Sequence, residues 1–290
     1  MTLIDAEVID PALPPPPAAS PEPVAAPARD GRVLGLTRAG VWVLLLLAAA
    51  NGLFLYLVPG RAETDYAWSI APPVNAAFIG AGFLAGTLAT GLVLRLATRW
   101  RSFALLPPAL WVLASSLFAA TLVHADRFRW DYAPTWVWTL VYGGVPLAIP
   151  VLVARQRRRA ARLPAADPAV VVLRVLSGIA GATLIAGAVA LYAAPADLGA
   201  HWPWALTPLL ARAVAAWYAL FGTMLLTFAI GMREPREGLI GYATLLTWSI
   251  LLLLLPPLHR DDVSGGVLWY VLMVALAALS AFGIRRATHP

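Results

Sequence analysis

The chain has 290 residues, of which 60% are hydrophobic and only 12% charged. A soluble domain of this length is nearer half apolar and a quarter charged, so we expect most of this surface to face lipid. The chain contains no cysteine, which excludes disulfides, thiolate metal sites and cysteine nucleophiles. All 21 basic residues are arginine, and their placement, described below, argues against nucleic acid as the partner of the net charge of +6.

Residues 1–37 differ in composition from the rest of the chain. The stretch from Pro11 to Pro27 is mostly proline and alanine, so it cannot bury a core and is expected to form an extended tail. Its first residues are acidic, which is unlike the basic start of a signal peptide. We interpret the tail as a solvated linker, with docking onto a partner protein as the alternative.

Eight apolar runs of roughly 20 residues follow, each long enough to cross the hydrocarbon core of a bilayer as a helix. They predict an all-α, polytopic membrane protein in contact with membrane lipids. Inside the fourth run, Pro146 and Pro150 predict a kink, and Gly82 and Gly86 of the second run form a small-residue face expected to pack against a neighbouring helix. The runs lie at 40–58, 73–94, 103–123, 135–154, 170–192, 208–231, 239–257 and 267–284.

The distribution of arginine predicts the orientation. Only Arg61, Arg127, Arg129 and Arg260 fall on one side of the predicted membrane, Arg212 falls within a span, and the other 16 of the 21 fall on the opposite side. Because short cytoplasmic loops are enriched in basic residues, the side with 16 arginines is predicted to be cytoplasmic, with both termini inside. We therefore expect a multi-pass protein of the bacterial cytoplasmic (inner) membrane. The opposite loops are rich in tryptophan, as expected at a membrane interface.

A shift of 136 residues places a set of uncommon residues on one another without a gap, although His124 then lies one residue out of register with His259. The matches predict an internal duplication, with four-helix units at 38–154 and 170–290 joined by a basic cytoplasmic linker at 155–169. Two such units have the same orientation in the membrane, and a binding site is expected at their interface. Matched pairs include Arg38 with Arg174, Pro59 with Pro195, Trp68 with Trp204 and Gly86 with Gly222.

Histidine and aspartate follow the third run of each unit. His124 and Asp126 end the third span, and His259 and Asp262 end the seventh. Imidazole and carboxylate ligands suit a divalent metal ion such as Zn²⁺, which could activate water if one position stayed open. The alternatives are solvated or capping loop residues, or two axial haem ligands.

Arg212 is the charge placed past the start of a predicted span, one turn after Pro208. A cation there is expected either to reach back to the interface or to anchor an anion, such as a lipid headgroup, in a pocket with Asn75, Trp68 and Trp204. Because no carboxylate lies within a span, proton-coupled transport is disfavoured. If Arg212 points into the protein, its expected partners are the carboxylates of Asp126, Asp131 and Asp197.

The segment Trp202-Pro203-Trp204-Ala205-Leu206-Thr207-Pro208-Leu209-Leu210-Ala211-Arg212 resembles a segment of uncharacterised multi-pass membrane proteins from bacteria with GC-rich genomes. The segments 75–82 and 124–128 are similar to the same group. The resemblance implies the membrane architecture and carries no activity with it.

These features favour a binding or transport protein with an outward-facing pocket between the two units. One alternative is a metal-dependent membrane enzyme on the outer face that acts on a lipid-linked substrate. The other is a non-catalytic membrane scaffold whose proline-rich tail holds a protein partner. The sequence contains no catalytic motif of high specificity that would decide among them.

Overall fold

The computed structural model describes residues 33, 35–97, 99–157, 167–168 and 170–289. Within these residues, eight helices are long and apolar enough to cross a membrane, which confirms the predicted all-α, eight-span architecture. Nearly all of the tail at 1–37 and most of the linker at 155–169 lie outside the described residues.

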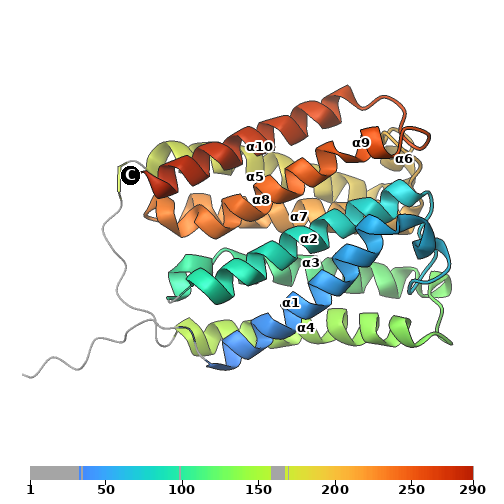
Figure 1. Cartoon of the computed structure of the whole chain (residues 1–290), viewed down its shortest axis with the longest axis horizontal. Helices are drawn as coiled ribbons and strands as arrows, with labels where there is room; N and C mark the ends of the chain where they lie inside the picture. Colours follow the sequence, from blue (N-terminus) through green and yellow to red (C-terminus); the bar gives the residue numbers. More distant parts are fainter. Residues whose placement is uncertain (1–32, 34, 98, 158–166, 169, 290) are drawn as a thin grey trace, which may run out of the picture.

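The long helices form one elongated bundle (Figure 1). Short helical segments extend or connect them, and two spans, Trp100–Val123 and Pro235–Leu258, each include such a segment. The long helices are α1 (Gly35–Leu57), α2 (Pro73–Leu96), α3 (Leu106–Val123), α4 (Ala133–Arg157), α5 (Val170–Ala193), α7 (Pro208–Gly231), α8 (Leu239–Leu253) and α10 (Val267–Thr288). The short segments are η1 (Pro59–Glu63), η2 (Trp100–Phe103), η3 (Ala125–Arg127), α6 (Pro195–Gly199), η4 (Pro235–Gly238) and α9 (Leu255–Leu258).

The two ends of the bundle differ chemically. We call one the arginine end, where α1 begins, α10 ends and the loops with η2 and η4 lie (Figure 1). The opposite end, with η1, η3, α6 and α9, carries the tryptophan-rich loops and is called the tryptophan end. An even number of spans places the first and the last helix terminus at the same end.

α4 continues through both of its prolines, Pro146 and Pro150. Because Pro150 has no N–H, the carbonyl oxygen of Pro146, four residues earlier, loses its helical donor. The indole Nε1–H of Trp111, on α3, donates to this oxygen over 3.0 Å. The neighbouring helix thus satisfies the backbone group that proline frees, as a membrane interior requires. The kink itself stays a prediction.

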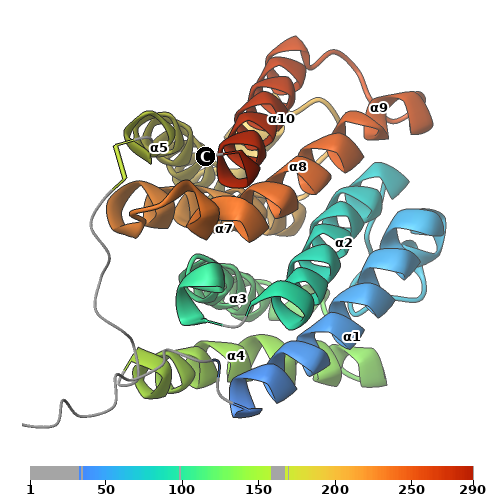
Figure 2. The same cartoon turned by 60° about the vertical axis from the view of Figure 1, so that its left-hand side comes forward.

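The two halves of the bundle interlock. In each half the first helix packs on the second, α1 on α2 and α5 on α7, whereas across the halves α2 packs on α8 and α3 on α7. Figure 2 shows α2, α3, α7 and α8 in the middle, with α1 and α4 on one side and α5 and α10 on the other. The predicted small-residue face does pack: a Cβ on Gly82 would lie 2.6 Å from the Trp217 ring of α7, and Gly86 faces Ala48 of α1.

Two arginines make the same contact in the two halves. The guanidinium Nη2 of Arg38 donates to the carbonyl oxygen of Leu94 over 3.0 Å. That of Arg174 is 3.4 Å from the carbonyl oxygen of Ile230. Donors and acceptors are both separated by 136 residues, the shift that aligned the sequence. Each bond joins the first helix of its half to the end of the second.

Two tyrosines make corresponding contacts across the halves. The Tyr56 hydroxyl donates to the carbonyl oxygen of Leu251 over 3.0 Å, and the Tyr192 hydroxyl donates to that of Ser116 over 2.8 Å. The acceptors are 135 residues apart, as are the starts of α2 and α7. The gap-free shift of 136 was therefore wrong by one residue beyond the first loop, and His124 and His259 are in register. These correspondences support the duplication, which stays a prediction.

Candidate functional site

A polar cavity of about 390 Å³ lies at the tryptophan end between the two halves. Three segments build its walls: the loop before α2, the end of α3 with η3, and the first turn of α7. The side chains that matter below are those of Trp68, Ser69, His124, Arg127, Thr207 and Leu209. Two of the four predicted ligand-binding or metal-binding positions in the first half, Trp68 and His124, therefore line one space.

Hydrogen bonds hold the loop that carries Trp68 against the connection between α3 and α4. The backbone N–H of Arg129 and the hydroxyl of Thr135 both donate to the carbonyl oxygen of Ala67, over 3.0 and 3.1 Å. The Arg129 guanidinium also donates to the carbonyl oxygen of Glu63 over 2.6 Å. The wall of the cavity is thus fixed by the chain itself before any ligand arrives.

The first turn of α7 supplies the wall from the second half. The Thr207 hydroxyl accepts a hydrogen bond of 3.3 Å from the Leu210 N–H, which caps the helix. Pro208 occupies the first helical position, where its missing N–H costs nothing. Because the start of a helix carries partial positive charge, this wall favours an anion over a cation.

Arg212 lies one turn further along α7 and points into the protein. Its Nη1 donates to His124 Nε2 over 2.6 Å, and its guanidinium carbon lies 5.7 Å from the centre of the Tyr192 ring. The predicted acidic partner is wrong, because within the described residues no carboxylate pairs with Arg212. Since packing of α3 on α7 brings His124 to the guanidinium first, the interior charge meets a neutral acceptor.

The electrostatics of the cavity follow from this pair. Burial and the nearby Arg212 guanidinium lower the pKa of His124, so the imidazole is neutral and its Nε2 is free to accept. Its proton then resides on Nδ1, which makes His124 a donor on its other side. Arg127 is exposed and pairs at 3.2 Å with the equally exposed Asp126, a weak surface contact. The positive charge of Arg212 therefore stays uncompensated.

Asn75 and Trp204 are not free to bind a ligand. The Trp204 indole N–H donates to Asn75 Oδ1 over 2.8 Å, and Asn75 Nδ2 donates to the carbonyl oxygens of Ala205 and Ala71 over 3.0 and 3.2 Å. Both side chains are buried, at 1% and 3% exposure. These bonds tie the start of α2 to the loop before α7, so the pair fastens the two halves together.

The four predicted metal ligands do not form one centre. Within the described part of the chain, no group of three or more histidine, aspartate or glutamate side chains is placed to hold a metal ion. A guanidinium occupies the Nε2 side of His124, and Asp126 turns to Arg127. His259 instead lies 3.7 Å from Asp262, and burial lowers its pKa although that carboxylate opposes the shift. The geometry gives the shared metal site no support.

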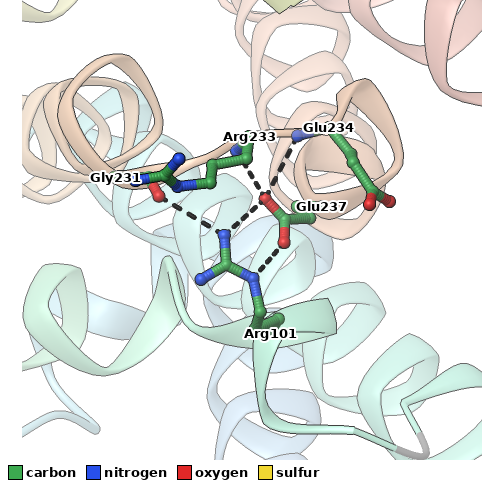
Figure 3. A network of polar contacts seen from close by, with 5 residues as sticks. All are labelled: Arg101, Gly231, Arg233, Glu234 and Glu237. Atoms are coloured by element: carbon green, nitrogen blue, oxygen red, sulfur yellow. Dashed lines mark hydrogen bonds and ion pairs between the residues drawn. The ribbon is translucent and has the colours of Figure 1, made fainter. Parts of the chain in front are cut away.

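A second polar cluster, at the arginine end, was missed from the sequence. Figure 3 shows Arg101 of η2 reaching Glu237 of η4. The buried Glu237 carboxylate accepts from Arg101 Nε and, over 2.8 Å, from Nη2. It also accepts from the backbone N–H groups of Arg233 and Glu234 over 2.7 and 3.3 Å. With all its oxygens engaged, the cluster joins the halves and leaves no ligand position.

The fold and the cavity define a multi-pass helical membrane protein with a basic, partly buried site between its two halves. Comparison with protein-family models, curated proteins and solved structures finds no match, so no activity comes to this chain from a relative. The resemblance to uncharacterised multi-pass proteins stays a prediction.

Proposed function

We propose that this membrane protein binds a small anionic ligand in the cavity between its halves, on the side of the membrane away from the cytoplasm. The observation that carries the proposal is Arg212, a cation within a span whose hydrogen-bond partner is the neutral His124 lining the cavity. A charge in such a place is costly, and charges retained within membrane spans are commonly functional.

The chemistry of the walls supports an anion in particular. The helix start at Thr207, the His124 Nδ1–H and the Arg127 guanidinium all present positive or donor groups to the same space. Phosphate is the ligand class that such a set recognises best, because its oxygens accept several hydrogen bonds at once. The phosphate could belong to a free ion or to a lipid headgroup.

The orientation rests on the arginine loops. The arginine end is proposed to face the cytoplasm, because short cytoplasmic loops are enriched in basic residues. The tryptophan end, and with it the cavity, then faces outward. A binding protein or the binding step of a transporter fits this arrangement, as does contact with anionic lipid in the outer leaflet.

Isothermal titration of the purified protein in neutral detergent with inorganic phosphate tests the free-ion source. Native mass spectrometry after exposure to vesicles of phosphatidylglycerol or phosphatidylcholine tests the lipid source. We expect Arg212→Gln to weaken binding about tenfold, since hydrogen bonds to charged groups are worth about 1.5–3 kcal/mol. Arg260→Gln is the matched control, because Arg260 is exposed at the same end.

Two results would contradict the proposal. One is the absence of saturable binding of phosphate and of selective retention of phosphatidylglycerol. The other is equal binding by the Arg212→Gln and Arg260→Gln proteins, which would mean that the interior charge serves stability alone.

A further inference from the structure

A second cavity, of about 340 Å³, lies within the first half of the protein, between α1, α2 and α4. Its walls are mainly apolar and aromatic, and it is lined among others by Leu47, Asn51, Tyr66, Phe83, Trp138 and Tyr142. In the described part of the chain, no charged side chain lines it. It is therefore unsuited to the anion proposed above and needs an occupant of its own.

The cavity lies beside the surrounding lipid. α1 packs on α2 and α4 packs on α3, whereas α1 and α4 make few contacts with each other. Figures 1 and 2 show these two helices along the same side of the bundle. Both helices are mostly exposed along their spans, and the exposed Val137 of α4 lines the cavity. A molecule dissolved in the bilayer can thus enter sideways between them.

Asn51 is a polar residue within the span of α1, and its orientation is fixed. Its Nδ2 donates to the carbonyl oxygen of Leu47 over 2.9 Å, which identifies that atom as the nitrogen. Its Oδ1 accepts from the Tyr66 hydroxyl over 3.0 Å. One amide hydrogen of Asn51 is left over as a donor at the cavity wall.

Tyr142 provides a second donor. The residue is 7% exposed, and its hydroxyl has no hydrogen-bond partner among the described residues, although a buried hydroxyl normally has one. It lies near the Tyr66 hydroxyl, since the two rings influence each other electrostatically. Its ring packs on Trp138, with 4.0 Å between centroids. Two unused donors and several aromatic faces therefore gather around one apolar space.

We infer that this cavity binds a membrane-soluble quinone, whose ring carbonyl oxygen accepts hydrogen bonds from Tyr142 and Asn51. An uncharged, planar, carbonyl-bearing ring satisfies both donors and stacks on aromatic side chains, which an acyl chain does not. The isoprenoid tail of such a molecule passes between α1 and α4 into the lipid. The inference is independent of the anion site and concerns binding only.

The second half offers an internal control. Thr183, Trp202, Tyr218 and Leu272 line a cavity of about 290 Å³ at the corresponding place between α5, α7 and α10. Gly187 occupies the position that matches Asn51 under the shift of 136, so this cavity lacks the amide donor. The Tyr218 hydroxyl is buried without a hydrogen-bond partner. Tyr218→Phe therefore changes a similar tyrosine outside the proposed site.

The experiment is titration of the purified full-length protein in neutral detergent with decylubiquinone, followed by calorimetry. Tyr142→Phe keeps the ring and removes the donor, so we expect affinity to fall about fivefold. Tyr218→Phe should bind as the wild type does. Leu47→Trp fills the first cavity and should abolish binding while the thermal transition stays cooperative.

The absence of saturable decylubiquinone binding in the wild type would overturn the inference, as would equal affinity of the Tyr142→Phe and wild-type proteins. Mass spectrometry supplies a further check. If phosphatidylethanolamine co-purifies with the wild type and is lost from Tyr142→Phe, a glycerolipid is the occupant and the quinone assignment is wrong.

Discussion

Replacing Arg101 by glutamine is expected to destabilise the protein more than any other change at an arginine-end loop. The Glu237 carboxylate is 8% exposed in its side chain and the Arg101 side chain 25% exposed, so the ion pair is largely shielded from water. Removing one member of a buried pair leaves the other charge unpaired, which costs about 3–5 kcal/mol. Two backbone N–H groups still donate to Glu237 in the variant. The expected loss of unfolding free energy is therefore about 3 kcal/mol, near the lower bound.

Thermal unfolding in one detergent, followed by tryptophan fluorescence, measures the effect. For chains of 150–250 residues, 1 kcal/mol corresponds to roughly 2–4 °C, so the midpoint should fall by roughly 6–12 °C. Arg236→Gln is the control, because Arg236 is exposed in the same turn and should change stability by less than about 0.5 kcal/mol. The double variant Arg101→Gln/Glu237→Gln should recover part of the loss, since it leaves no buried charge. Equal midpoints for Arg101→Gln and Arg236→Gln would refute the reasoning.

Three further predictions concern the tryptophan end and the orientation. Because burial lowers the pKa of His124, the unfolded chain binds its proton more readily than the folded protein, so stability is lost as pH falls below about 6.5; unfolding midpoints between pH 8 and 5 should fall less for His124→Gln, and parallel curves would contradict this. Single cysteines at Ser264 and at Thr288 should differ in intact cells, only the first reacting with a membrane-impermeant maleimide, and the reverse pattern would overturn the topology. Asn75→Ala leaves the Trp204 N–H without its acceptor and should cost about 1–3 kcal/mol in the same thermal assay, whereas an unchanged midpoint would deny this pair a fastening role.

The membrane architecture was predictable because it depends on local features of the chain. Apolar runs of span length and prolines at the starts of the second and sixth runs located the long helices to within a few residues. A bilayer requires each spanning segment to satisfy its own backbone, which makes such runs easy to interpret. Duplication and orientation depend on weaker patterns, and they stay predictions.

The partners of the polar residues were not predictable in the same way. Arg212 and His124 are 88 residues apart and meet only because α3 packs on α7. The sequence suggested a carboxylate for Arg212 because opposite charges pair, but nothing local placed one there. Asn75 was correctly identified as a residue of the interface, yet its neighbour Trp204 consumes the acceptor that a ligand would have used. Arg101 was interpreted only as a topology signal.

The crossed packing of the bundle also bears on motion. In many carriers built from repeats, one repeat rocks as a rigid body against the other around a fixed site. Here α2 packs on α8 and α3 on α7, so each half holds a helix of the other. Tyr56 and Tyr192 each donate a hydrogen bond across that boundary. A rigid rotation would have to break both contacts together with the Arg101–Glu237 ion pair. The architecture therefore favours a receptor of fixed shape, whose ligand exchange depends on loop movement, over a carrier that alternates between two orientations.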